Sequence, residues 1–295
     1  MNNSKQLALK VQSALVGFSN FNNFSMNLTK VFFIGMSLFF VFSCSKDETQ
    51  TVVNFTELIM HDDFDTDGSP SNALWTYDIG NGNATTGAGW GNNELQYYTN
   101  RSQNVKVENG MLQITARKEN FMGSQYTSGR IITKGLFEQA YGRFEARIKM
   151  PWGQGIWPAF WLVGANVDNV GWPQCGEIDI MEYRGQEPTK ILGTVHGPGY
   201  SGGAAISKSY SLVNDRFDND FHVFGIEWGP AYINFYVDNA LYNQITPKDV
   251  TGEWVYNHPF YIILNLAVGG NFVGSPNSTT TFPQTMLVDY VRVYQ

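Results

Sequence analysis

One segment of the sequence places three acidic side chains among bulky apolar ones: Gly176-Glu-Ile-Asp-Ile-Met-Glu182. Burying an unpaired carboxylate is costly, and the neighbouring sequence offers no partners for these three. Carboxylates grouped in this way suit general acid and base chemistry. Their mutual repulsion raises the pKa of at least one of them and keeps it protonated near neutral pH. The segment is therefore the first candidate for an active site.

The spacing of the three carboxylates predicts a distorted strand. On a regular strand Glu177 and Asp179 share a face, whereas Glu182 points to the other side. One extra residue at Ile180 or Met181, a β-bulge, returns Glu182 to the face of Glu177. The two glutamates are then roughly 13 Å apart at their Cα atoms, and side chains that lean together can approach the ~5–5.5 Å separation of a retaining glycosidase. One glutamate would be the nucleophile and the other the acid and base, with Asp179 sharing a proton or hydrogen bond with the nucleophile; spacing alone does not decide which glutamate does which.

The elements around this segment are predicted to be strands. From about Thr56 onward, segments of alternating apolar and polar residues recur with Gly, Asn or Pro between them, which is typical of half-buried antiparallel strands. Asn109-Gly110 is a hairpin signal. The clearest segments are 105–107, 111–117, 142–150, 221–228, 232–238, 261–268 and 287–294. Because no long 3.6-residue apolar period is present, we expect an all-β fold, a single two-sheet β-sandwich.

Composition and charge exclude several classes of protein. The chain has 295 residues, of which 43% are apolar and 15% aromatic, so it can bury a large core and is not disordered. Residues 1–43 hold three lysines and no acid, which leaves 16 basic against 26 acidic side chains in the remainder. This negative charge argues against nucleic acid and polyanionic sugars as partners. The only cysteines, Cys44 and Cys175, cannot form a disulfide framework or a Cys-rich metal site.

The N-terminal region has the pattern of an export signal. Lys30 precedes an apolar run over residues 31–42, which is too short to span a bilayer as a helix, and Met26 is the better start. The run ends in Ser43-Cys44, which resembles a bacterial lipoprotein signal in which Cys44 receives a lipid. The alternative is an ordinary signal peptide with an incidental cysteine. We expect a signal peptide over 1–43, a tether over 44–55 and one domain over 56–295, exported across the inner membrane and anchored to the outer membrane only through the lipid.

The acidic segment resembles the catalytic signature of glycoside hydrolase family 16. It has the bulged Glu-x-Asp-x-x-Glu form of laminarinase-like endo-β-1,3-glucanases, whereas related lichenases, agarases and carrageenases have the unbulged Glu-x-Asp-x-Glu. The resemblance covers about residues 56–295 and includes motifs at 90–98, 155–162, 171–173, 193–197 and 288–294. It implies a concanavalin-like β-jelly roll with an open concave cleft. It also implies that Glu177 is the nucleophile, Asp179 its assistant and Glu182 the acid and base.

Substrate-binding residues follow from the resemblance and from the chemistry of sugars. Sugar rings have apolar faces that stack on indole rings, so a cleft for a neutral glucan should be lined with tryptophan. The residues implied are Trp157, Trp161 and Trp172 for stacking, Asn92 and Arg130 as donors to hydroxyl groups, and His196 as a contact or hydrogen-bond partner beside the carboxylates. For any one tryptophan core packing is the alternative, and His196 could instead be a metal ligand together with the carboxylates.

A structural calcium ion is also implied by the family. Backbone carbonyls near Asp63 and Gly110 and the side chain of Asp289 would hold it, away from the chemistry, although Asp289 could simply be an acid at a strand end. We expect no cofactor for catalysis.

The sequence thus predicts a monomeric, retaining endo-glycosidase that hydrolyses internal β-1,3 bonds of laminarin-like or mixed-linkage β-glucans. One alternative is a non-catalytic glycan-binding jelly-roll module, which would need neither Glu177 nor Glu182. Another is the same chemistry on agar or xyloglucan. The extra residue between Asp179 and Glu182 and the negative charge disfavour sulfated galactans.

Overall fold

The computed structural model describes residues 54–295, so the predicted signal peptide, Cys44 and most of the predicted tether lie outside the described residues. Within this part nearly all regular structure is β. The exceptions are α1 (Val167–Val170) and two short 3-10 turns, η1 (Gly89–Gly91) and η2 (Gly202–Ala204). The predicted all-β fold is confirmed. None of the helices described is long and apolar enough to cross a membrane.

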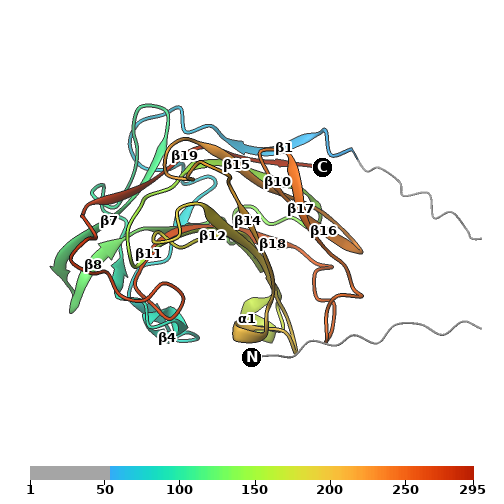
Figure 1. Cartoon of the computed structure of the whole chain (residues 1–295). Helices are drawn as coiled ribbons and strands as arrows, with labels where there is room; N and C mark the ends of the chain where they lie inside the picture. The colour runs from blue at the N-terminus through green and yellow to red at the C-terminus, as the bar shows by residue number, and fades with distance from the viewer. Residues whose placement is uncertain (1–53) are drawn as a thin grey trace, which may run out of the picture. The chain divides into compact units, whose positions relative to one another are not determined.

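Two large sheets form the domain (Figure 1). The first sheet follows the order β17 (Ala240–Ile245), β16 (Tyr232–Val237), β15 (His222–Gly229), β10 (Gly142–Lys149), β19 (Gln284–Tyr294), β7 (Leu112–Phe121), β8 (Ser124–Ser128), β5 (Gln96–Tyr98), with β1 (Leu58–Asp62) on β19 and β6 (Val105–Val107) on β7. The second sheet follows β14 (Ile206–Ser211), β13 (Lys190–His196), β12 (Glu177–Tyr183), β11 (Ile156–Gly164), β18 (Phe260–Val268), β9 (Arg130–Ile132), β2 (Thr76–Tyr77). A small hairpin joins β3 (Gly82–Asn83) to β4 (Gly87–Ala88).

The core lies between the two sheets and explains the period-two pattern of the sequence. On β7, buried and half-buried residues alternate from Leu112 to Ala116, and the buried ones join a single apolar cluster with residues of the second sheet. On β11 the same alternation buries Phe160 and Leu162 in this cluster. Residues that alternate with them, such as Trp157 and Trp161, therefore face away from the first sheet.

The predicted hairpin at Asn109-Gly110 is present. Asn109 (φ 56°) and Gly110 (φ 70°) both adopt the left-handed conformation, and β6 pairs antiparallel with β7 on either side of them. One pairing differs from the antiparallel expectation, because β5 and β8 are parallel. Their parallel pairing is possible since β6 and β7 lie between them in the chain and provide a long crossover connection.

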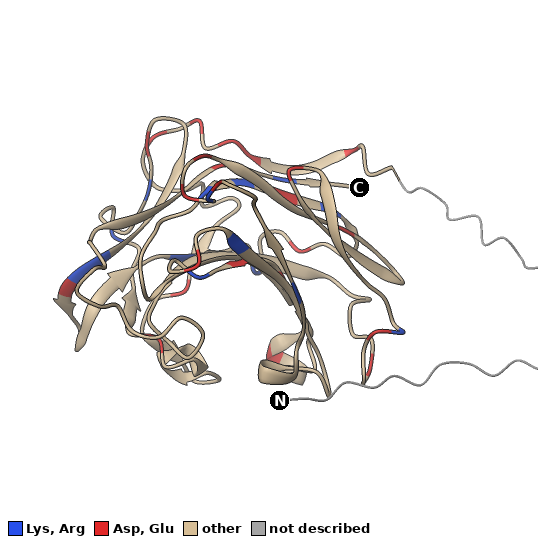
Figure 2. Ribbon diagram, viewed as in Figure 1, with Lys and Arg blue, Asp and Glu red and all other residues tan. Residues whose placement is uncertain are grey.

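The second sheet is strongly curved, with its outer face on the concave side (Figure 1). The loop with α1 and the β3–β4 hairpin lie on either side of this concave face (Figure 1). Across residues 54–295, acidic and basic positions are interspersed along both sheets and their loops (Figure 2). The concave face is therefore the surface on which the positions of the predicted site residues have to be judged.

Candidate active site

The acidic segment forms β12, and its pairing shows the predicted bulge. Against β13, Asp179 pairs with Thr194 and Glu182 with Leu192, so three steps on β12 match two on β13. Against β11, Asp179 pairs with Trp161 and Met181 with Phe160, which leaves Ile180 as the extra residue.

The bulge divides the side chains of β12 between two environments. Ile178, Ile180, Met181 and Tyr183 are buried in the core between the sheets. Glu177, Asp179 and Glu182 are not part of that cluster, and each has polar partners on β13 or on the loop before β12. Apolar burial on one face thus fixes the strand while the three acidic side chains share the other.

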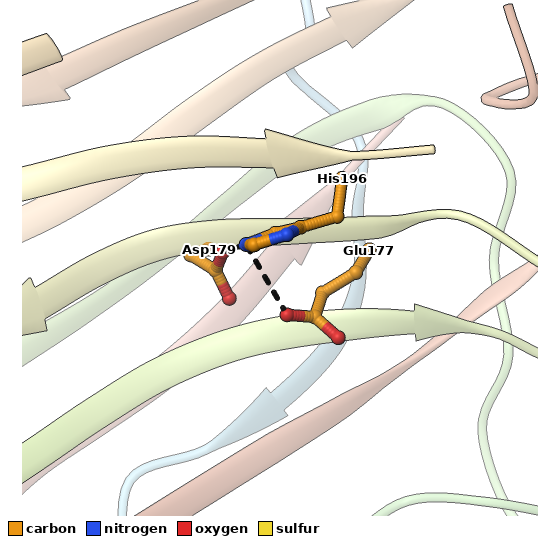
Figure 3. Close-up of side chains that lie close together, drawn as sticks. All are labelled: Glu177, Asp179 and His196. Atoms are coloured by element: carbon orange, nitrogen blue, oxygen red, sulfur yellow. Dashed lines mark ion pairs between the residues drawn. The ribbon is translucent and has the colours of Figure 1, made fainter. Parts of the chain in front are cut away.

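His196, at the end of β13, lies beside two of the carboxylates (Figure 3). Its Nε2 is 3.1 Å from Asp179 Oδ2 and 3.6 Å from Glu177 Oε1. Antiparallel pairing places His196 directly opposite Glu177. The structure therefore brings His196 to the carboxylates, where the sequence predicted it.

Trp172 contacts the same carboxylate from the loop that precedes β12. Its Nε1 donates a hydrogen bond of 2.9 Å to Glu177 Oε2, and its ring lies 5.8 Å from the His196 ring. The Trp172 side chain is nevertheless 43% exposed. Its indole is thus held at the carboxylate while part of it stays open for a ligand.

Glu182 has a weaker set of partners. Thr194 Oγ1 lies 3.4 Å from Glu182 Oε2, and the same hydroxyl is 2.9 Å from Ser207 Oγ. A 3.4 Å hydrogen bond is long, and it is neutral at the donor. Glu182 therefore lacks a short hydrogen bond of the kind that Glu177 accepts from Trp172.

The pKa values of this cluster are strongly shifted. Burial, followed by repulsion from Asp179, raises the pKa of both Glu177 and Glu182 to about 8. Burial alone would lower the pKa of His196, but the hydrogen bond to Asp179 and the three negative charges outweigh it and raise that pKa to about 9. The cluster therefore holds protons through neutral pH, as the sequence predicted for at least one carboxyl group.

Glu177, Asp179 and His196 also form the one group of such side chains in the described part of the chain that could surround a metal ion. The backbone N–H of Gly202 faces His196 Nδ1 at 3.1 Å, so a neutral ring carries its proton on Nε2, and the charged ring that a pKa of about 9 favours carries one there as well. A protonated Nε2 facing Asp179 is a hydrogen-bond donor and has no lone pair for a metal. The geometry fits a hydrogen-bonding role for His196.

Trp157 and Trp161 lie on the same face of β11, as their spacing predicted. Trp161 Nε1 donates to Asn265 Oδ1 at 2.7 Å, whereas Trp157 packs against Phe272 with ring centroids 4.9 Å apart. Trp157 Nε1 is buried without a hydrogen-bond partner in the described structure. Neither indole belongs to the main core cluster, so both are placed to line the concave face.

Arg130 is held between two indole rings. Its guanidinium carbon lies 4.9 Å from the ring of Trp161 and 4.6 Å from that of Trp90, and Asp78 pairs with its Nε at 2.8 Å. Stacking on both sides fixes the plane of the guanidinium group. Arg130 is therefore a rigid donor group beside Trp161.

Asn92 is exposed and lies in the loop before β5. Its Nδ2 donates to Glu94 Oε1 at 3.2 Å, and its backbone carbonyl accepts from Asn271 at 2.8 Å. The sequence did not single out the residues that support these groups, namely Trp90, Glu94, Asn265 and Phe272. Trp90 and Glu94 stand inside the quoted 90–98 motif, which is the only sequence signal for them.

The comparisons with known proteins agree with this geometry. The model of the glycosyl hydrolases family 16 matches residues 92–292. A β-glucanase of Rhodothermus marinus is 41% identical over 249 residues, covering 81% of this chain and 85% of that protein. The solved endo-β-1,3-glucanase of Pyrococcus furiosus is 51% identical with a TM-score of 0.78, covering 81% of this chain and 94% of its own. The catalytic domain of a Thermotoga petrophila laminarinase is 48% identical with a TM-score of 0.77, covering 81% and 97%.

These matches span the described domain, including the bulged acidic strand and the motifs around it. The family model covers more than half of the chain, and the relatives are similar over most of their own length. The chain therefore belongs to the glycosyl hydrolases family 16.

Proposed function

We propose that the protein is a retaining endo-β-1,3-glucanase that acts on laminarin-like or mixed-linkage β-glucans. The observation that carries the proposal is the bulged strand, which aligns Glu177, Asp179 and Glu182 away from the core with shifted pKa values. The similar proteins named above are a β-glucanase, an endo-β-1,3-glucanase and a laminarinase. The substrate assignment rests on them together with the aromatic concave face.

The hydrogen bonds support one division of roles between the two glutamates. Trp172 Nε1–H and the His196 ring both face Glu177, so ionisation is favoured at Glu177. Glu182 also feels the charge of His196, but its one hydrogen bond is the long one from Thr194, so we assign the proton to Glu182. Glu177 is then the nucleophile, and Glu182 is the acid.

The reaction proceeds in two displacements. Glu177 attacks the anomeric carbon while Glu182 gives its proton to the departing glycosidic oxygen, which leaves a glycosyl ester on Glu177. Glu182, now a carboxylate, takes a proton from water, and the resulting hydroxide oxygen attacks the same carbon and releases Glu177. Two inversions give net retention. His196 lies between Asp179 and Glu177, and its positive charge stabilises the Glu177 carboxylate through this cycle.

A neutral glucan suits the rest of the concave face. Trp157, Trp161 and Trp172 offer indole faces to the apolar sides of sugar rings, and Arg130 and Asn92 offer polar groups to hydroxyls. All of these groups come from one domain, so the proposal requires a single copy of the chain. A purely glycan-binding role would leave the cluster of buried carboxylates without a purpose.

The stereochemistry of two variants tests the mechanism. We expect Glu177→Gly and Glu182→Gly to lose at least about 1,000-fold in kcat on laminarin. With an activated aryl β-glucan oligosaccharide and added azide, Glu182→Gly should form the β-glycosyl azide and Glu177→Gly the α-glycosyl azide, because azide replaces water in the first and the nucleophile in the second.

The anomeric form of each azide product is read by NMR. An α-glycosyl azide from Glu182→Gly would reverse the roles, and full activity in either variant would refute the hydrolase proposal. Wild-type products on laminarin, lichenan, agarose and xyloglucan, compared side by side, test the substrate. Cleavage of agarose alone would overturn the glucan assignment and leave the mechanism in place.

We also propose that the protein is exported and anchored through a lipid on Cys44. The basic residue, the apolar run and the cysteine at its end support this. Cys44→Ala should then move the protein from the membrane fraction to the soluble fraction of the producing cells. An unchanged distribution would favour an ordinary signal peptide.

A structural calcium ion near Asp63, Gly110 and Asp289 is a further proposal. Pairing of Asp62 with Val291 and of Leu112 with Val288 brings both loops next to this part of β19. Arg147 donates a hydrogen bond of 2.8 Å to Asp289 Oδ2, and no described residue donates one to Asp289 Oδ1. Oδ1 is therefore available to bind calcium, as a hard oxygen ligand beside the backbone carbonyls. Removal of calcium with a chelator should lower the melting temperature, whereas an unchanged melting curve would exclude the ion.

A further inference from the structure

Glu94 is a carboxylate at the edge of the concave face for which the mechanism has no use. It is partly buried in the loop before β5, and all of its side-chain partners are donors. Oε2 accepts from Gln96 Nε2 at 2.6 Å and from the Tyr98 hydroxyl at 3.3 Å, while Oε1 accepts from Asn92 Nδ2 at 3.2 Å. Oε2 therefore accepts hydrogen bonds from two buried side chains, and Oε1 accepts one from the exposed amide of Asn92.

The interior partners are themselves fixed. Gln96 is completely buried, and its Oε1 accepts the backbone N–H of Val268 at 2.8 Å. Tyr98 is also completely buried, and its hydroxyl accepts from Asn265 Nδ2 at 3.0 Å. Because both groups already accept a hydrogen bond at their oxygen atoms, their protons are directed to Glu94.

The hydrogen bonds extend from Tyr98 through Asn265 to Trp161. Trp161 Nε1–H donates to Asn265 Oδ1, which sets the amide of Asn265 with its N–H₂ toward Tyr98. Every donor in this series of hydrogen bonds points toward Glu94. The network therefore needs, at position 94, a side chain whose terminal atoms only accept hydrogen bonds. An ionised carboxylate meets this need, whereas a glutamine can accept at one of its two terminal atoms only.

The pKa of Glu94 lies above its ordinary value, so the case for an ionised carboxylate rests on the directions of the hydrogen bonds. Burial raises the pKa, and the hydrogen bonds from Gln96 and Asn92 and the charge of Arg130 oppose that effect. Asp78 pairs with Arg130, so Glu94 is left to neutral donors for most of its stabilisation.

Asn92 stands at the outer end of the network. Its Nδ2 is taken by Glu94, so the carbonyl Oδ1 and the second N–H are left for a ligand. Its loop is pinned to the neighbouring loop by Asn271 N–H to the Asn92 carbonyl, and by Asn93 Nδ2 to Asn271 Oδ1 at 2.9 Å. The backbone at Asn92 is therefore fixed, and the hydrogen bond to Glu94 determines only the orientation of the Asn92 side-chain amide.

We propose that Glu94 is a positioning residue that fixes the side-chain amide of Asn92, so that Asn92 presents its carbonyl oxygen to a sugar hydroxyl of the bound glucan. This inference rests on the proposed glucanase function. Glu94 acts through Asn92, and none of its side-chain hydrogen bonds reaches Glu177, Asp179 or Glu182. Its loss should therefore weaken substrate binding and leave the chemical step intact.

Glu94→Gln is the first test, with laminarin oligosaccharides as substrate. The new amide keeps its oxygen toward Gln96 and Tyr98, so its N–H₂ meets the N–H₂ of Asn92 and forces that amide to turn over. We expect KM to rise about fivefold with kcat within about twofold, since one well-oriented hydrogen bond is worth about 1 kcal/mol.

A paired exchange distinguishes positioning from a general structural role. Asn92→Asp places a carboxylate against Glu94 and should raise KM further, and because Asn92 is exposed this variant leaves the buried network untouched. In Asn92→Asp/Glu94→Gln, the glutamine N–H₂ donates to the aspartate, whose other oxygen replaces the carbonyl of Asn92. We expect KM of the double variant to fall below that of Asn92→Asp alone and toward that of the wild type.

Glu119→Gln is the matched control. The Glu119 carboxylate also accepts hydrogen bonds from side chains, those of Thr127 and Arg101, but lies on β7 of the other sheet. Its KM should equal that of the wild type. An unchanged KM in Glu94→Gln, or a double variant no better than Asn92→Asp, would overturn the inference. A wild-type protein that fails to cleave laminarin oligosaccharides would instead refute the proposed function.

Discussion

Trp172 has two roles at the residue scale, since its exposed ring can stack on a sugar while its N–H fixes the charge of Glu177. Trp172→Phe keeps an aromatic face and removes the donor. A hydrogen bond to a carboxylate stabilises the charged form, so its loss raises the pKa of Glu177. Because a nucleophile must be ionised, the acidic limb of the kcat/KM profile should move to higher pH, by about one unit.

The measurement is kcat/KM on laminarin from pH 4 to pH 9 for the wild type and the variant. Trp157→Phe is the matched control, because Trp157 Nε1 has no partner among the described residues. Its acidic limb should stay in place. If Trp172→Phe raises KM without moving the acidic limb of the kcat/KM profile, the hydrogen bond from Trp172 does not control the pKa of Glu177.

Residues that act through local geometry could be predicted from sequence, and those that depend on distant contacts could not. Glu177, Asp179 and Glu182 lie within six consecutive residues, so strand periodicity and one bulge suffice to group them. Tyr98 and Asn265, in contrast, are 167 residues apart when their side chains meet. No pattern in a single sequence indicates such a pair, and for that reason the support of Asn92 and Trp161 emerged only from the structure.

The bulge in β12 is the element on which the site depends. Deletion of Ile180 gives Glu-Ile-Asp-Met-Glu, in which plain alternation keeps both glutamates on one face.

We therefore expect the Ile180 deletion to retain measurable hydrolysis of laminarin, reduced by about 10- to 100-fold because the carboxyl positions shift by a fraction of a residue. Rates on laminarin and the circular dichroism spectrum test this. A folded but wholly inactive deletion variant would contradict the account of the bulge.

Strands were predictable wherever one face is buried and the other is not. The segment 142–150 alternates and corresponds to β10, and the segment 287–294 lies within β19. β18 is buried at all nine positions, since the core covers one face and other side chains cover the concave one. The segment 261–268 is among those predicted to be half-buried strands, and the strand is confirmed but its burial does not alternate. The parallel pairing of β5 with β8 was not predictable, because nothing local marks which distant strand β5 will meet.

At the scale of the whole molecule, the active site opposes stability at alkaline pH. Glu177 and Glu182 have a pKa of about 8 in the folded protein against about 4.5 when unfolded. Between these values the folded state binds more protons than the unfolded state, so stability falls as pH rises from about 4.5 to about 8. His196 acts in the same direction, since its pKa of about 9 exceeds the ordinary histidine value of 6.5 and its stabilisation is lost as pH rises toward 9.

Glu182→Gln should therefore stabilise the domain at high pH while it abolishes hydrolysis. The amide keeps an oxygen for the Thr194 hydroxyl and carries no charge, so the cost of ionising a buried group disappears. At pH 9 we expect a gain on the order of 2 kcal/mol, roughly 4–8 °C in melting temperature for a domain of this size, and little difference at pH 4.5. Glu119→Gln should show the opposite sign, because hydrogen bonds from Thr127 and Arg101 lower the pKa of Glu119 and stabilise the fold once it is ionised. Melting curves at both pH values measure both effects, and a Glu182→Gln variant that is no more stable than the wild type at pH 9 would show that the folded protein ionises Glu182 without cost.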